Sequence, residues 1–139
     1  MKVNKKNENY DSFEQNVYKE LVQHQEIKDK VTLTESGKVE INYNKYLLIV
    51  VEYDYQLIYY GDKKQTHIHI EDESELIKWL LDIANDKEIF IEDKRKFSFR
   101  SLFVGSLQSI SLEKFNKKKN KYIKKGYLRI FTGNQIIKE

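Results

Sequence analysis

The longest apolar run of this chain is Tyr46-Leu47-Leu48-Ile49-Val50-Val51. Successive residues of a strand point to opposite faces, and here both alternating sets are apolar. This is typical of a central β-strand that is covered on both faces. The stretch is far too short to cross a bilayer as a helix. We therefore predict that it lies in the middle of a β-sheet, to which the rest of the chain adds further strands and helices.

On the N-terminal side of this stretch, the spacing of the residues predicts a hairpin and a helix. Residues 31–34 and 39–43 alternate apolar with polar side chains on either side of a glycine-containing turn. Further upstream, Ser12 is followed three residues later by Gln15, and the two can form a capping box. The pattern therefore predicts a helix over residues 12–26, ahead of two antiparallel strands.

On the C-terminal side, residues 53–60 and 66–70 are predicted strands separated by a turn. A second helix is predicted between Asp72, which can cap its N-terminus, and Asn85. Its apolar side chains form two adjacent stripes, Leu76, Leu80 and Ile83 in one and Ile77, Leu81 and Ala84 in the other. Two adjacent stripes predict a helix that is mostly buried.

The last part of the chain returns to strands. Residues 89–91 and 127–131 are predicted strands, and residues 97–99 alternate in the same way. Residues 106–115 fit either a helix or a strand by the spacing of their apolar side chains, and we prefer the strand. The segment 114–125 is rich in lysine and asparagine, and we expect it to be an exposed basic loop.

Together these elements predict the α+β class. We expect a single domain over residues 1–139, with a mostly antiparallel sheet of about six or seven strands and two helices packed on it. Residues 1–10 are polar, and we expect them to be frayed.

The composition excludes several kinds of protein. Cysteine is absent, which rules out a disulfide framework, a thiolate zinc site and a cysteine nucleophile. The N-terminus lacks the apolar stretch of a signal peptide, and no run is long enough to span a bilayer, so we expect a cytoplasmic protein with no membrane partner. We find no phosphate-binding glycine loop, nucleophile elbow or zinc-protease helix, and predict neither a catalytic residue nor a cofactor.

Two histidines are the weak candidates for a metal site. His67 and His69 alternate within a predicted strand and share one face with Glu71. With Gly61 and Glu73, their spacing resembles the first half of the cupin metal motif, but the later glycine, the proline and the further histidine of that family are missing. We therefore interpret both histidines as solvated side chains and predict no metal site.

The charge of the chain is strongly polarised. Residues 1–93 carry 12 Lys and Arg against 20 Asp and Glu, a net charge of −8, whereas residues 94–139 carry 13 against 2, a net charge of +11. Lysines neutralise phosphates and aromatic side chains stack on bases, so the basic part is a candidate nucleic-acid interface. Its candidate residues are Lys94, Arg95, Lys96, Arg100, Lys117, Lys118, Lys119, Lys121, Lys124 and Lys125.

Tyrosines on the predicted strands point to a different partner. Protein interfaces use rigid aromatic anchors surrounded by steering charge, and the acidic part of the chain offers both. We take Tyr53, Tyr55 and Tyr60 as the candidate protein-binding residues. Their alternative role is that of half-buried strand residues.

The stretch from Tyr59-Tyr60-Gly61 through His67-Ile68-His69 into Glu75-Leu76-Ile77-Lys78-Trp79-Leu80-Leu81 combines a hairpin with a buried helix. In this respect the chain resembles the small immunity proteins that low-GC Gram-positive bacteria encode beside polymorphic toxins, and it also resembles phage-encoded inhibitors. The resemblance implies a non-enzymatic inhibitor that binds a protein partner, either a toxin or a host defence enzyme, and occludes it. The alternative is a nucleic-acid-binding protein that uses the basic C-terminal third.

Overall fold

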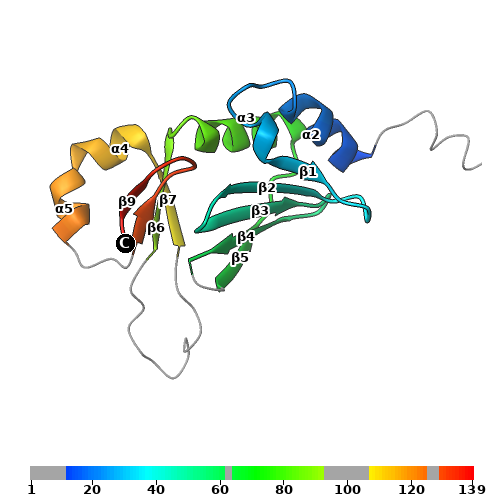
Figure 1. Cartoon of the computed structure of the whole chain (residues 1–139). Helices are drawn as coiled ribbons and strands as arrows, with labels where there is room; N and C mark the ends of the chain where they lie inside the picture. Colours follow the sequence, from blue (N-terminus) through cyan, green and yellow to red (C-terminus); the bar gives the residue numbers. More distant parts are fainter. Residues whose placement is uncertain (1–11, 62–63, 93–106, 125–128) are drawn as a thin grey trace, which may run out of the picture.

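The computed structural model describes residues 12–61, 64–92, 107–124 and 129–139. Within these residues the chain forms two antiparallel sheets of five and four strands, together with four α-helices and one short 3-10 helix at Lys28–Lys30. The predicted α+β class and the antiparallel pairing are confirmed. The strands divide between two sheets that lie side by side under helix α3 (Figure 1), whereas a single sheet was predicted.

The first sheet is a meander in which every strand pairs with its neighbour in the sequence. Its order is β1-β2-β3-β4-β5, so β3 occupies the predicted central position. The bounds of its strands are β1 Val31–Leu33, β2 Val39–Asn44, β3 Leu47–Val51, β4 Gln56–Tyr60 and β5 Lys64–Ile68. Strand β5 begins two residues earlier than predicted, because Gly61 adopts a φ of 60° and lets Lys64 pair directly with Tyr60.

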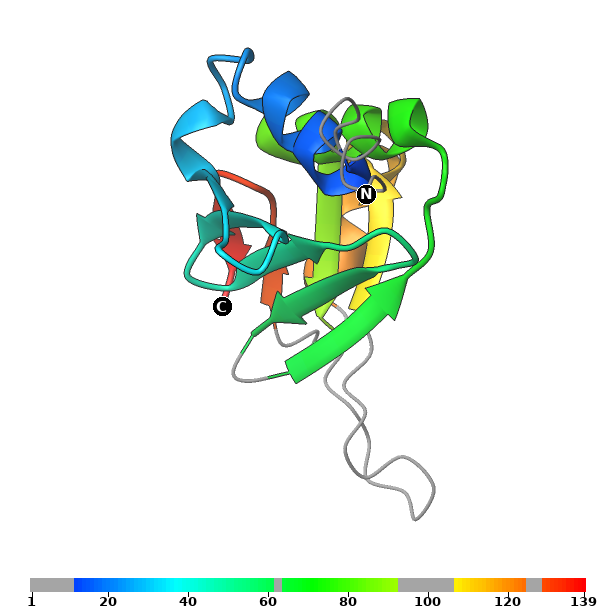
Figure 2. The same ribbon diagram turned by 90° about the vertical axis from the view of Figure 1, so that its right-hand side faces the viewer.

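Two helices cover one face of this sheet (Figure 2). Helix α2 spans Phe13–Leu21 and helix α3 spans Glu73–Ala84. Asp72 caps α3 as predicted, whereas α2 ends at Leu21 because Val22 caps it and the chain then turns. Between the helices and the sheet lies the main core, which includes Val17, Leu21, Ile41, Ile49, Leu76, Leu80 and Ile83. Tyr43 reaches this core and donates its hydroxyl to the carbonyl of Leu80 at 2.7 Å, and burial raises its pKa.

The predicted capping box of α2 is present and allows a direct test. Ser12 Oγ accepts from the backbone N–H of Gln15 at 3.0 Å, and the Gln15 side chain accepts from the backbone N–H of Ser12 at 2.9 Å. We expect Ser12→Ala to lower the free energy of unfolding by about 1 kcal/mol, because two N–H groups lose their fixed partners. Ser74→Ala, in the first turn of α3, serves as the control in urea denaturation and should not destabilise. An equal loss in both variants would contradict a capping role for Ser12.

The second sheet has the order β7-β6-β8-β9. Its strands are β6 Glu88–Glu92, β7 Leu107–Ser111, β8 Arg129–Phe131 and β9 Ile136–Lys138. Phe90 and Phe131 face the main core, whereas Ile89 and Ile91 pack in a second cluster with Phe115. Strand β6 is therefore buried on both faces. We had expected this arrangement for a different strand, that at residues 46–51.

The segment predicted as a basic loop is helical where it is described. Helix α4 spans Leu112–Lys117 and α5 spans Lys119–Lys124, and the ambiguous stretch before them is strand β7 up to Ser111. The prediction of a loop was wrong because lysine is a good helix former, no glycine or proline interrupts residues 112–124, and Ser111 caps α4. The predictions of a frayed N-terminus at residues 1–10, of strand-like alternation at residues 97–99 and of the end of the basic loop at residue 125 concern positions outside the described residues.

Candidate functional site

The outer face of the first sheet carries an aromatic and aliphatic surface. Along β4, alternate residues turn away from α2 and α3, and the register places His67 opposite Leu57 and Leu48 opposite Tyr59. We call this surface the aromatic face and define it by residues Leu48, Val50, Tyr55, Leu57, Tyr59 and His67. Figures 1 and 2 show that α2 and α3 both lie on one side of this sheet.

The apolar side chains of the aromatic face belong to neither core cluster. Leu48 and Leu57 are half-buried, Val50 is buried between its neighbours, and Tyr59 is 37% exposed. None of the four is part of the main core or of the cluster around Phe115. This face therefore presents apolar area to solvent at the centre of a sheet, with Asn42 and Gln65 as polar neighbours on the flanking strands.

The structure separates the three tyrosines that the sequence singled out. Tyr60 is 2% exposed and belongs to the main core, so it offers almost no surface to a partner. Tyr53 is 62% exposed but lies edge-on to Phe13 of α2, with ring centroids 5.6 Å apart, away from the aromatic face. Only Tyr55 joins the aromatic face. Tyr59 was missed because residues 57–60 are all apolar. Without an alternation of polar and apolar residues, the sequence cannot show which side chains face outward.

The two candidate metal ligands lie together at the edge of the aromatic face. The rings of His67 and His69 are 5.1 Å apart, and Tyr55 lies 6.3 Å from each of them. His69 Nδ1 lies 3.1 Å from the carbonyl oxygen of Asp54, which positions the ring as a hydrogen-bond donor in the matching tautomer. No group of three or more metal-ligating side chains occurs in the described residues, so Glu71 does not complete a site with them there.

A hollow of about 230 Å³ opens at the end of the aromatic face. Tyr59, Leu48 and Asn42 line it from the outer face, and Lys45 and Lys64 lie at its rim. A concavity beside an exposed aromatic ring is a common feature of the centre of a protein interface.

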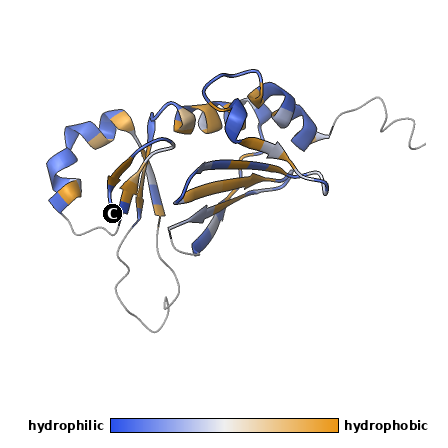
Figure 3. Ribbon diagram, viewed as in Figure 1, coloured by the Kyte–Doolittle hydropathy of each residue, from blue (hydrophilic) through white to orange (hydrophobic). Residues whose placement is uncertain are grey.

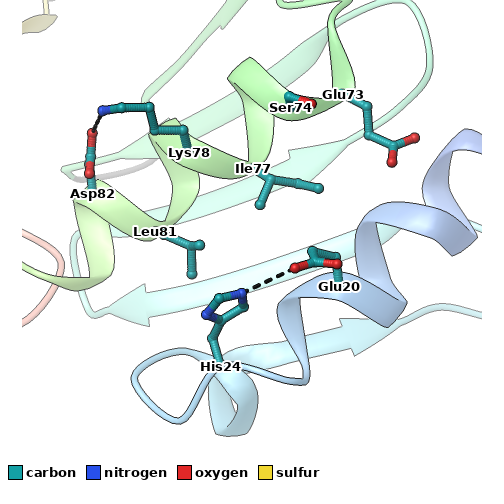
Figure 4. Close-up of a pocket in the computed structure, with 8 residues that line it drawn as sticks. All are labelled: Glu20, His24, Glu73, Ser74, Ile77, Lys78, Leu81 and Asp82. Carbon is teal, nitrogen blue, oxygen red and sulfur yellow. Dashed lines mark hydrogen bonds and ion pairs between the residues drawn. The ribbon is translucent and has the colours of Figure 1, made fainter.

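A second hollow, a groove of about 540 Å³, lies between α2 and α3 (Figure 4). Ile77 and Leu81, from the stripe predicted to be buried, line it half-exposed. Several of its polar side chains are paired with close neighbours in the sequence. His24, just beyond the end of α2, lies 3.3 Å from Glu20. Within α3, Lys78 donates to Asp82 at 2.8 Å, a hydrogen bond that raises the pKa of Lys78.

The third feature is the basic helix pair, residues 112–124, which comprises α4 and α5. Its six lysines are all exposed, and none of them forms an ion pair with another described residue. Figure 3 shows these helices as predominantly hydrophilic at the periphery of the molecule. Four of the predicted nucleic-acid-binding lysines line one hollow, namely Lys117, Lys118, Lys119 and Lys121. Lys124 lies on α5, whereas Lys94, Arg95, Lys96, Arg100 and Lys125 lie outside the described residues.

The most buried charge in the described structure joins the two sheets. Glu92 at the end of β6 is fully buried, and it accepts from Lys64 Nζ at 2.5 Å and from Arg129 at 2.9 Å. Arg129 also lies over the ring of Tyr46, 4.5 Å from its centroid. We call Glu92, Lys64 and Arg129 the Glu92 ion cluster. Because its members come from β6, β5 and β8, it acts as a structural link between the sheets.

No protein-family model, curated protein or solved structure matches this chain. Among the described helices, none has the length and apolar character needed to cross a membrane.

Proposed function

We propose that this protein is a non-enzymatic inhibitor that binds a protein partner through the aromatic face and occludes it. The observation that carries the proposal is the row formed by Leu57 and Tyr59 on β4 and by Tyr55 just before it, which lies outside both core clusters. An exposed tyrosine beside half-buried leucine side chains and a hollow provides rigid contact area at a low cost in side-chain entropy. Residues 1–93 carry a net charge of −8, which would steer a basic partner surface at long range.

The biological setting of the proposal follows from the resemblance to immunity proteins and phage inhibitors. In this setting the partner is either a toxin or a host defence enzyme, and a stoichiometric complex blocks its active surface. A gene for a large secreted toxin directly upstream would support an immunity role, whereas a phage or mobile-element context would support an antagonist.

The binding surface is tested with matched tyrosine variants. We expect Tyr59→Ala to weaken binding about 30-fold, since loss of an aromatic anchor at the centre of an interface costs about 2 kcal/mol. Tyr53→Ala removes the same kind of side chain from a more exposed position beside α2, and it should leave the affinity within about threefold. The measurement is titration of the partner that co-purifies with the tagged wild-type chain from the encoding organism.

Two results would contradict the proposal. Equal losses in both variants would show that binding is not specific to the aromatic face, and unchanged affinity in both would place the interface elsewhere. Because Tyr59 lies outside the core clusters, its removal should change the free energy of unfolding by less than about 1 kcal/mol, which urea denaturation checks.

A further inference from the structure

The basic helix pair is a candidate site independent of the aromatic face. Its exposed lysines lack ion-pair partners among the described residues, so their charge is not neutralised within that part of the chain. The hollow between α4 and α5 has a volume of about 360 Å³. Its lining is restricted to lysines and to two amide side chains, those of Asn116 and Asn120, with neither a carboxylate nor an apolar side chain.

We propose that the basic helix pair binds the phosphate backbone of duplex nucleic acid, with Lys117, Lys118, Lys119 and Lys121 as the principal contacts. This activity goes beyond the proposed protein-binding function and does not depend on it. Lysine ammonium groups neutralise phosphates as point charges, and asparagine amides can donate to phosphate oxygens regardless of sequence. A hollow with only these donors suits an anion rich in oxygen atoms.

The aromatic residues of the helix pair argue against recognition of unstacked bases. Phe115 is buried against the second sheet, and Tyr122 stacks on it with ring centroids 5.6 Å apart and an interplanar angle of 18°. Their rings therefore serve the packing of α4 and α5, whereas single-strand binding requires aromatic faces open to bases. The remaining groups are lysine ammonium and asparagine amide groups, which suit contacts with the phosphate backbone of a duplex.

The same helices are poorly suited to an anionic membrane. Their exposed large apolar side chains are Leu112 and Ile123, which are 38% and 37% exposed. Each helix has six residues. A helix that lies in a membrane interface needs a continuous apolar face in addition to its basic residues. These helices are therefore better suited to bind the phosphates of a nucleic acid than those of lipid headgroups.

The test measures how binding of a short labelled duplex of mixed sequence depends on salt, by fluorescence anisotropy with the full chain. Each phosphate contact contributes about 0.9 to the slope of log K against log salt, so four to six contacts give a slope of about −4 to −5. We expect Lys117→Ala/Lys118→Ala/Lys119→Ala/Lys121→Ala to flatten this slope by about 3.6 and to weaken binding about tenfold or more in low salt. Alanine has the highest helix propensity, so the helices should persist.

The matched control removes the same charge elsewhere. Lys19→Ala/Lys28→Ala/Lys38→Ala/Lys87→Ala changes four exposed lysines outside the helix pair and should retain the wild-type slope. Equal flattening in both quadruple variants would overturn the proposal, because it would show an effect of net charge alone. A shallow slope in the wild type, tighter binding of single strands than of duplex, or binding only to vesicles with anionic lipid would also overturn it.

Discussion

Glu92→Gln is expected to lower the free energy of unfolding by about 3 kcal/mol, a large fraction of the stability of a small domain. The carboxylate is fully buried, and it forms ion pairs with both Lys64 and Arg129. Glutamine keeps the shape but removes the charge, leaving two cations with no carboxylate between them. Because Lys64 is 28% exposed and can turn toward water, we place the loss at the lower end of the range for broken buried ion pairs.

The control for this variant lies on the same strand. Glu88 at the start of β6 accepts from Ser109 Oγ in an exposed setting, and Glu88→Gln should cost less than about 1 kcal/mol in urea denaturation. A double-mutant cycle adds a second check. In a Lys64→Gln background, Glu92→Gln should cost at least about 1 kcal/mol less than in the wild type. Equal losses for the substitutions at positions 92 and 88 would show that the ion cluster does not link the sheets energetically.

Gly61→Ala is the second substitution with a large expected effect, a loss of about 2–4 kcal/mol in the free energy of unfolding. Gly61 has a φ of 60°, which costs an alanine about 1–2 kcal/mol. A Cβ at this position would also lie 2.6 Å and 2.7 Å from the two carboxylate oxygens of Glu92. That carboxylate cannot retreat easily, because two cations hold it, and overpacking of this kind costs about 1–3 kcal/mol.

Gly37 supplies the matched control for the backbone part of this cost. It has a φ of 90°, and a Cβ there would meet nothing within 4 Å, so Gly37→Ala carries strain without a clash. We expect Gly61→Ala to be the more destabilising by about 1–3 kcal/mol in thermal or urea unfolding. In a Glu92→Ala background the clash disappears, and the difference between the two glycines should vanish. A difference that persisted there would disprove contact with Glu92 as its cause.

Local spacing predicted the individual elements well because their determinants lie within a few residues of one another. The capping box at Ser12 and Gln15, the cap at Asp72 and the hairpin of β1 and β2 depend on backbone groups three to five residues apart. The central position of β3 was also predictable, since a strand that is apolar at both parities avoids the edge of a sheet.

The candidate sites were only partly predictable. Four lysines chosen from composition line one hollow, but their helical conformation was missed, because the signal for α4 consists of Ser111 as a cap and Phe115 as an anchor on β6. Tyr60 was chosen as an exposed anchor and is buried, whereas Tyr59 was overlooked. Adjacent residues of a strand point to opposite faces, so which of the two tyrosines is exposed depends on the face that the helices cover.

Short-range periodicity and charge were enough to predict the α+β class, the hairpin of β1 and β2, the starts of α2 and α3 and the separation of acidic from basic residues. They could not predict that the strands form two sheets, that Glu92 is buried between Lys64 and Arg129, or that Tyr55, Leu57 and Tyr59 face outward. The physical reason is that these features depend on contacts between residues tens of positions apart, whose pairing is selected by the packing of the whole core rather than by any local pattern.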